Sequence, residues 1–240
     1  MNSHRPLYLA FLVLGLFIAA NAQADWIDSV TKALGISKTP SAMRGESGIF
    51  DGDIRVVGID GSAPAALTAG GGYRSPIFVA DDTAVLALTG THVVRIPLKG
   101  GTPMQLHAVP GAVKLLGVDQ NDAQKILLLV ETQERGSELA SLSLKTGKII
   151  RLPHERSDRN QRILLSHLRG EDREYKELSL YLRPESKSGM GGNIEWKDVY
   201  MKRGTALPVN LSRCDGVDCR QPTLSHNRQR IVFIRATTGQ

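Results

Sequence analysis

The sequence that decides the fold runs from Tyr73 to Ala108. It reads Ser75-Pro-Ile-Phe-Val-Ala-Asp-Asp, Thr83-Ala-Val-Leu-Ala-Leu-Thr-Gly, His92-Val-Val-Arg-Ile-Pro-Leu-Lys-Gly-Gly and Thr102-Pro-Met-Gln-Leu-His. These are four short β-rich runs, and turn residues separate them closely enough to make neighbouring strands antiparallel. A four-stranded meander of about 40 residues is the blade of a β-propeller. The stretch therefore predicts an all-β protein built from such units.

The same pattern returns twice after this stretch. In the second unit we expect strands over 113–118, 125–131, 138–144 and 149–152. In the third unit we expect strands over 163–168, 175–182, 194–202 and 206–211, with a turn at 170–173 and a Gly/Ser-rich insertion over 183–192. Both units have the strand lengths and the turn residues of a complete blade.

Half a unit remains at each end of the patterned region. Asp53–Asp60 and Ala65–Thr68 form an outer pair without inner strands, and Gln221–Arg235 forms an inner pair without outer strands. If the two halves join, they complete a fourth, composite blade and cover backbone groups that would otherwise be exposed edges. The prediction is a small β-propeller of about four blades of four antiparallel strands, closed by pairing of the N- and C-terminal strands.

One terminal segment resembles a known repeat. Pro222-Thr-Leu-Ser-His-Asn-Arg-Gln-Arg-Ile-Val-Phe is similar to the Pro-x-Trp-Ser-Pro-Asp-Gly-x-x-Ile-Ala-Phe repeat of the WD40-like periplasmic propellers related to TolB. The positions that match are Pro222, Ser225, Ile231 and Phe233, whereas His226-Asn227-Arg228 replaces the Pro-Asp-Gly turn. The resemblance implies a periplasmic scaffold that binds another protein or a ligand, and it carries over no catalytic residue.

The N-terminus has the features of an export signal. Arg5 precedes an apolar run over 9–20, and Ala22-Gln23-Ala24 is a small-x-small cleavage pattern. We therefore expect a signal peptide over 1–24, a mature start near Asp25, and a periplasmic or secreted protein without stable membrane insertion after cleavage. An uncleaved anchor is the alternative. A short helix over 25–36 and a linker should fill 25–46, before the propeller domain over 47–240.

The chain has two cysteines, Cys214 and Cys219, which enclose Asp-Gly-Val-Asp. An even pair in an exported protein predicts a disulfide. A zinc site is the alternative, but it needs two further ligands, and only His226 is close in sequence.

The net charge of +6 does not come from one long basic run. The most basic segment, 148–173, contains candidate partner-binding residues, namely Lys148, Arg151, Arg156, Arg159 and Arg162. It could contact an anionic component of the cell envelope, or it could be a solvated rim. Nucleic acid is not an expected partner, because stacking aromatic residues are missing nearby and the protein is exported.

The sequence has no recognisable catalytic or cofactor motif. Acidic turns such as Asp81-Asp82 could hold calcium, but turn chemistry explains them equally well. We therefore predict a non-catalytic binding or scaffold protein without cofactor or metal, whose propeller face binds a protein partner in the cell envelope. The alternatives are a hydrolase or lyase with its active site in the propeller funnel, and a binder of anionic envelope components through the 148–173 segment.

Overall fold

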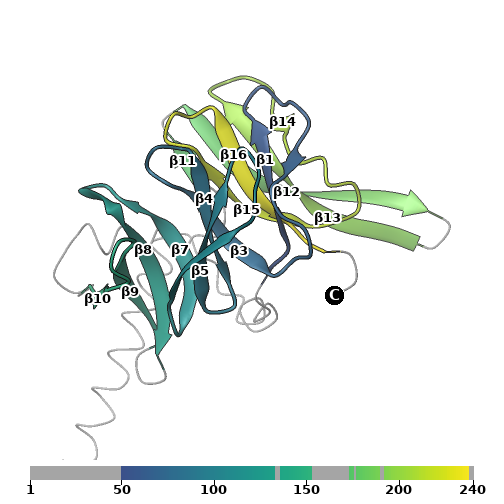
Figure 1. Ribbon diagram of the computed structural model, residues 1–240. Helices are drawn as coiled ribbons and strands as arrows, with labels where there is room; N and C mark the ends of the chain where they lie inside the picture. The colour runs from purple at the N-terminus through teal and green to yellow at the C-terminus, as the bar shows by residue number, and fades with distance from the viewer. Residues whose placement is uncertain (1–49, 133–135, 153–172, 176, 190–191, 238–240) are drawn as a thin grey trace, which may run out of the picture. The chain divides into compact units, whose positions relative to one another are not determined.

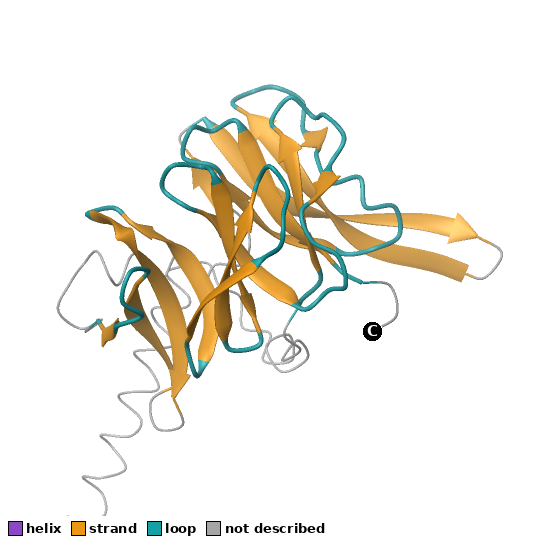
Figure 2. Cartoon of the chain, in the orientation of Figure 1, coloured by secondary structure: helices purple, strands orange, loops and turns teal. Residues whose placement is uncertain are grey.

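All regular secondary structure in the described part of the chain is β-strand (Figure 2). The computed structural model describes residues 50–132, 136–152, 173–175, 177–189 and 192–237. Within them, 16 strands form four antiparallel sheets of four strands each (Figure 1). This confirms the predicted all-β class and the four-stranded unit.

The sheets correspond to the units expected from the sequence. The first sheet consists of β3 (Tyr73–Phe78), β4 (Ala84–Thr89), β5 (His92–Pro97) and β6 (Met104–Ala108). The second sheet consists of β7 (Ala112–Asp119), β8 (Asp122–Thr132), β9 (Gly136–Ser143) and β10 (Ile149–Arg151). The third sheet consists of β11 (Arg173–Tyr175), β12 (Leu178–Gly189), β13 (Gly192–Arg203) and β14 (Val209–Asn210).

The remaining sheet joins the two ends of the described chain. In this composite sheet the order is β15 (Cys219–Leu224), β16 (Arg230–Arg235), β1 (Asp53–Gly58) and β2 (Ala65–Ala66). β16 pairs with β1 over six residues, from Asp53 opposite Arg235 to Gly58 opposite Arg230. The predicted pairing of N- and C-terminal strands is thus confirmed. It satisfies backbone groups on β1 and β16 that would otherwise form exposed edges.

Three apolar cores hold neighbouring sheets together. One packs the first sheet against the second, around Leu86, Leu88 and Leu128. Another packs the first sheet against the composite sheet, and the third packs the composite sheet against the third sheet. Contacts therefore join the sheets in the order second, first, composite, third. Between the second and third sheets, the described strands make no contact of similar extent. The contacts between the described strands therefore do not close the four sheets into a ring.

The third sheet differs from its prediction in two places. The predicted end of the turn over 170–173 is wrong, because Arg173 is already the first residue of β11. The insertion expected over 183–192 is also wrong, because β12 continues to Gly189 and pairs with β13 from Gly192 onward, forming a long hairpin (Figure 1). The polar residues there lie on an exposed two-stranded ribbon, so they lack the apolar alternation that marks a half-buried strand. The inner strand expected over 163–168 lies outside the described residues.

Two hairpins repeat the same backbone conformation. Ser75 in β3 and Gln221 in β15 both have positive φ, at 52° and 57°. The next residue in each case is a proline, and each strand shifts register there. Proline has no N–H, so it suits a bulge that interrupts the hydrogen-bond ladder. The repetition shows that the first and composite sheets share one structural unit.

The predicted signal peptide over 1–24 and the predicted helix over 25–36 lie outside the described residues. No helix in the part of the chain that the structure describes has the length and hydropathy needed to cross a membrane.

Candidate partner-binding face

The turn between β15 and β16 is held rigidly by its own side chains. The buried Ser225 hydroxyl accepts hydrogen bonds from the backbone N–H of Gln229, at 3.1 Å, and of Arg230, at 3.0 Å. It also donates to Oδ1 of Asn227 at 2.8 Å. Asn227 Oδ1 accepts a further bond from the Gln229 N–H at 3.0 Å. These bonds fix the path of the turn and leave its remaining side chains to face solvent.

Asp82 of the first sheet fixes the same turn from outside. Its Oδ1 accepts the backbone N–H of His226 at 2.9 Å, and its Oδ2 accepts that of Asn227 at 2.8 Å. Nδ1 of His226 lies 3.1 Å from Oδ1 of the same carboxylate. Asp82 itself has a φ of 52°, a conformation that aspartate tolerates better than most residues. The first sheet therefore anchors the turn of the composite sheet.

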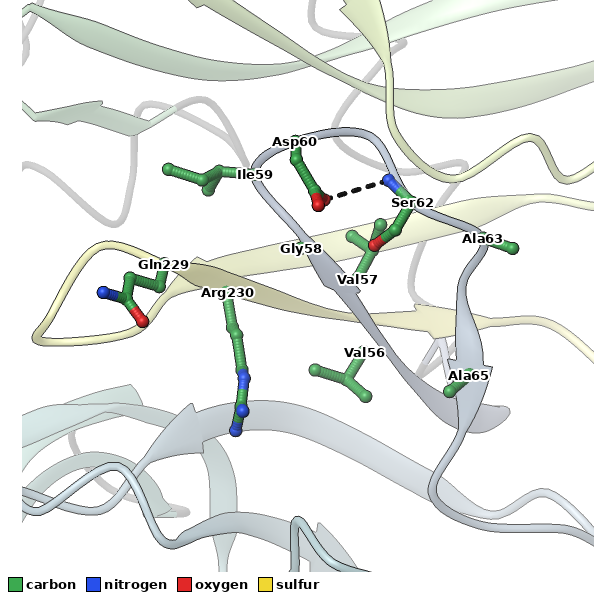
Figure 3. A pocket seen from close by; sticks show the side chains of 10 residues that line it. All are labelled: Val56, Val57, Gly58, Ile59, Asp60, Ser62, Ala63, Ala65, Gln229 and Arg230. Carbon is green, nitrogen blue, oxygen red and sulfur yellow. Dashed lines mark hydrogen bonds between the residues drawn. The ribbon is translucent and has the colours of Figure 1, made fainter.

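Two surface hollows meet this turn. One, of about 490 Å³, lies beside the β1–β2 loop and includes Gln229 and Arg230 in its lining (Figure 3). The other, of about 680 Å³, lies beside the turns of the third sheet and includes Arg228, Arg203 and Glu177. Since three consecutive turn residues line the two hollows, the β15–β16 turn is the feature that they share.

The surroundings of the turn combine charge with an exposed apolar side chain. Leu207, on the β13–β14 turn next to the larger hollow, is 86% exposed. Arg228 and Arg230 are exposed as well. Arginine is enriched at protein interfaces, and an exposed apolar side chain such as Leu207 is stabilised when a partner buries it. We refer to the β15–β16 turn, its two hollows and Leu207 as the turn face.

The acidic turns use their carboxylates to form the turns themselves. Oδ1 of Asp60 accepts the N–H of Ser62 at 3.0 Å, and Oδ1 of Asp81 accepts the N–H of Thr83 at 3.1 Å. The bond from the Ser62 N–H lowers the pKa of Asp60, and the pKa of Asp81 is lowered first by a bond from the Thr83 hydroxyl, at 2.8 Å, and then by the bond from the Thr83 N–H. Each bond spans two residues, as expected for aspartate in turns. Turn formation thus accounts for these carboxylates without a metal ion.

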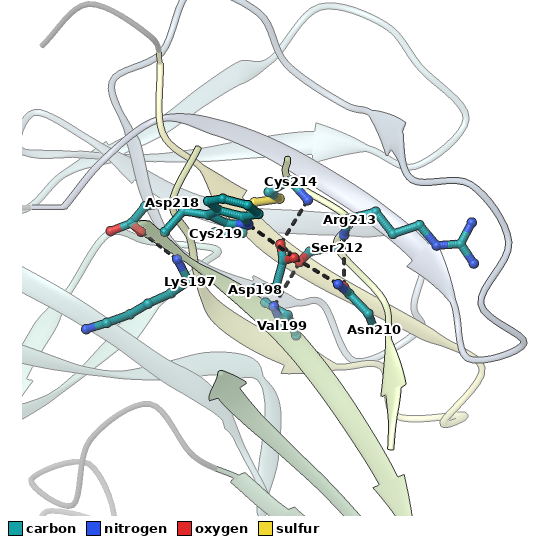
Figure 4. The surroundings of a disulfide bond; sticks show 10 residues. Lys197, Asp198, Val199, Asn210, Ser212, Arg213, Cys214, Asp218 and Cys219 are labelled. Atoms are coloured by element: carbon teal, nitrogen blue, oxygen red, sulfur yellow. Dashed lines mark hydrogen bonds between the residues drawn. A yellow bond between two sulfur atoms is a disulfide. The ribbon is translucent and has the colours of Figure 1, made fainter. Parts of the chain in front are cut away.

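Cys214 and Cys219 form the predicted disulfide (Figure 4). The zinc alternative is thereby wrong, because both sulfur atoms are used in the bond. Next to it lies Asp198, a residue that is only 2% exposed. Its Oδ1 accepts the Cys214 N–H and the Ser212 hydroxyl, each at 2.8 Å, and its Oδ2 accepts the Asn210 side-chain amide at 2.8 Å. The satisfied carboxylate ties the loop after β14 to β13.

The structure describes two of the five basic residues proposed to bind a partner. Lys148 is exposed in the turn before β10. Arg151 lies on β10, where its Nε is 3.4 Å from a carboxylate oxygen of Glu138. Arg156, Arg159 and Arg162 lie outside the described residues. The use of this segment in binding stays a prediction.

No catalytic constellation is visible in the described residues. No group of three or more His, Cys, Asp and Glu side chains gathers there in a way that could hold a metal. The pair formed by His226 and Asp82 has a serine beside it in the sequence, but the Ser225 hydroxyl is buried and bonded within the turn. It is therefore not available as a nucleophile for His226.

Sequence reasoning did not select the residues of the turn face. The segment His226-Asn227-Arg228 was noted only as a departure from the Pro-Asp-Gly turn of the related repeats. That departure was a usable signal, because it places a cation at a turn position normally filled by glycine. For Leu207 we find no comparable signal, because its exposure depends on how the β13–β14 turn is placed.

Comparison with known proteins gives only remote likenesses. No protein-family profile and no curated protein matches the chain. A protein assigned as TolB from Agrobacterium tumefaciens is 14% identical, with a TM-score of 0.35 over 81% of this chain and 65% of that one. TolB from Acinetobacter baumannii is 15% identical, with a TM-score of 0.36 over 86% and 53%.

A third solved structure, the AtxE2 isopeptidase with Astexin3-dC4 bound, is 15% identical, with a TM-score of 0.30 over 57% of this chain and 20% of that one. The chain thus spans no more than 65% of the length of any of these three proteins. Because all three TM-scores lie below 0.5, these likenesses carry no argument about fold or function.

Proposed function

We propose that this protein is an exported, non-catalytic binding or scaffold protein, a propeller of the TolB type, and that its turn face binds a protein partner in the cell envelope. The observation that carries the proposal is the rigid β15–β16 turn, whose consecutive residues Arg228, Gln229 and Arg230 line two hollows. The export signal predicted from the sequence supports the location, and the repeats in the sequence support the propeller type.

The turn face suits binding because little of it has to be ordered when a partner arrives. Asp82 and Ser225 already fix the turn through six hydrogen bonds to it, four of them from backbone N–H groups. A preorganised surface pays less conformational entropy on association. The exposed Leu207 supplies apolar area, and the arginines supply directional donors to acceptor groups of the partner.

A pull-down from cell-envelope extract tests the proposal. The bait is the mature protein, residues 25–240, and mass spectrometry identifies what is retained. Leu207→Asp adds a charge to the turn face, and Thr91→Asp adds the same charge at the β4–β5 turn, at the opposite end of the first sheet. Both residues are exposed, so neither substitution should disturb the fold.

We expect one protein to be retained in stoichiometric amount by the wild type and by Thr91→Asp, and lost from Leu207→Asp. Equal retention by both variants would show that the partner binds outside the turn face. An empty pull-down with a well-folded bait would contradict the binding of a stable protein partner.

A further inference from the structure

A separate hollow, of about 290 Å³, is lined by three arginines. They are Arg55 from β1, Arg235 from β16 and Arg213 from the loop after β14, and the rest of the lining comes from Pro64, Ser212 and Phe233. Like charges repel one another, so three guanidinium groups around one small hollow need a reason. The hollow plays no part in the turn face proposed above.

The strand register explains how two of the arginines come to share this hollow. Arg55 lies directly opposite Phe233 in the pairing of β1 with β16, and Arg235 is two residues further along β16. Paired residues, and residues two apart on a strand, point to the same face of a sheet. Both arginines therefore belong to the face that carries Phe233, which packs against the third sheet.

The third arginine, Arg213, is oriented by its backbone conformation and by one hydrogen bond. Arg213 has a φ of 47°, and its guanidinium donates to the carbonyl oxygen of Gly61 at 3.0 Å. Figure 4 shows that its side chain points away from Asp198 and from the disulfide. The carboxylate of Asp198 is saturated by other donors, so Arg213 is not held as its ion-pair partner.

The charge of the three arginines is not compensated by the residues that the structure describes. No carboxylate there forms an ion pair with Arg55, Arg213 or Arg235. Asp53 lies opposite Arg235 in the register, but its Oδ1 accepts the N–H of Gly71 at 2.9 Å. In addition, Nε of Arg55 is buried and has no hydrogen-bond acceptor. A buried donor without an acceptor is costly, so the site is incomplete as it stands.

Two other arginines of the described chain, Arg220 and Arg74, donate hydrogen bonds to acceptors of the protein. Arg220 donates from two nitrogens to Oδ2 of Asp218, at 3.1 and 2.8 Å, and its guanidinium lies 5.0 Å from the centre of the Phe50 ring. The buried Arg74 donates from one terminal nitrogen to the carbonyl oxygens of Gly90 and Ala112, whereas its Nε has no acceptor. What sets Arg55, Arg213 and Arg235 apart among the described arginines is that all three line one hollow and none is paired with a carboxylate.

We propose that this hollow binds an oxyanion, the phosphate or carboxylate group of a small ligand, held between Arg55, Arg213 and Arg235. Guanidinium groups bind such oxygens through charge-assisted, often paired hydrogen bonds. Phe233 and Pro64 add an apolar wall against which the organic part of the ligand packs. The small volume admits a compact ligand only.

The test uses the full mature protein and titrates it with sodium phosphate, sodium acetate and sodium chloride at constant ionic strength. Binding is followed by the NMR signals of the arginine Nε–H groups and by calorimetry. Arg213→Met is the main variant, because Arg213 is exposed and its loss should leave the fold intact. Arg228→Met is the matched control, because it removes the same charge from the turn face.

We expect phosphate or acetate to bind with saturation and to shift the Arg55 Nε–H signal, whereas chloride does not. Arg213→Met should weaken that binding about tenfold or more, which is the effect of losing one charged hydrogen bond, and Arg228→Met should leave it unchanged. A stronger response to phosphate identifies a phosphate-bearing ligand, and a stronger response to acetate identifies a carboxylate. Equal responses to all three anions, or undiminished binding in a folded Arg213→Met protein, would overturn the proposal.

Discussion

The hairpins β3–β4 and β15–β16 have the same backbone conformation but present different side chains. In the first sheet, positive φ occurs at Ser75 and Asp82, and in the composite sheet it occurs at Gln221 and Arg228, with the same spacing in both. Asp82 is turned toward the composite sheet and bonds to its turn. Arg228, at the equivalent position, is exposed and lines a hollow.

The comparison teaches that one backbone repeat can serve two purposes. At the Asp82 position the side chain bonds across the contact between sheets, and at the Arg228 position it is exposed beside a hollow, where we propose that a partner binds. Substitutions at paired positions of the two hairpins should therefore differ in what they damage. At the turn positions Asp82 and Arg228, a substitution in the first sheet should lower stability, whereas one in the composite sheet should affect binding.

The largest contrast is expected one residue before each bulge. Arg74→Met should lower the free energy of unfolding by about 3 kcal/mol, because it removes a buried donor to the Ala112 carbonyl and a partly buried donor to the Gly90 carbonyl. Arg220→Met should cost about 1 kcal/mol, because its ion pair with Asp218 is partly exposed. Urea unfolding measures both values. Similar values for the two variants would show that the bond from Arg74 to Ala112 does not stabilise the contact between the first and second sheets.

The bulge residues themselves provide the next contrast. Oε1 of Gln221 accepts the N–H of Ser75 at 2.6 Å, and its side-chain amide donates to the Phe50 carbonyl at 3.3 Å. Gln221→Leu should cost about 2 kcal/mol, because the Ser75 N–H loses its acceptor. Ser75→Ala keeps that N–H and should change stability by less than about 0.5 kcal/mol. If Ser75→Ala were as damaging as Gln221→Leu, the bond between the two strands would not be the cause.

At the second positive-φ position the two hairpins should respond in opposite directions. Asp82→Gly should lower stability by about 1–2 kcal/mol, because the N–H groups of His226 and Asn227 lose their acceptor. Arg228→Gly should raise stability by up to about 1 kcal/mol, because glycine adopts a φ of 58° without steric cost. Thermal unfolding of the two variants side by side gives the signs. Destabilisation by both would mean that Arg228 also supports the fold.

The smallest contrast concerns pH. Hydrogen bonds from the hydroxyl and the N–H of Thr83 lower the pKa of Asp81 below the ordinary value of an aspartate. A carboxyl group whose pKa is lower in the folded state stabilises the protein above its unfolded pKa, and this stabilisation is lost as the pH falls through the folded value. The position equivalent to Asp81 in the composite sheet is Asn227, which does not titrate.

Unfolding free energies measured between pH 5 and pH 3 should therefore fall less steeply for Asp81→Asn than for the wild type. Asp60, which also has a lowered pKa, should keep part of the slope in both proteins. Identical slopes would mean that the bond from Thr83 is equally strong for the protonated carboxyl group.

The sequence predicted those parts of the fold that local pattern and turn chemistry determine. Tight turns such as Asp81-Asp82 and the apolar runs between them located the strands of the first and second sheets. The missing halves at the two ends predicted the pairing of β1 with β16. The extended β12–β13 hairpin was missed, because an exposed ribbon of polar residues has no apolar alternation by which to recognise it.

The candidate site was harder to predict because it depends on contacts between distant segments. Asp82 and His226 are far apart in the sequence, and only the packing of the first sheet on the composite sheet brings them together. The three arginines around the smaller hollow likewise come from both ends of the described chain. Residue patterns record periodicity within an element, but they do not record which turns meet.

The most direct test of the central claim, that the turn face binds the partner, is photo-cross-linking in intact cells. A photo-reactive amino acid replaces Leu207 in one version of the protein and Thr91 in another. Both positions are exposed, and they lie on turns at opposite ends of their sheets. The account predicts a discrete cross-linked product with one envelope protein from position 207 and none from position 91. A product from position 91 alone, or equal products from both positions, would contradict it.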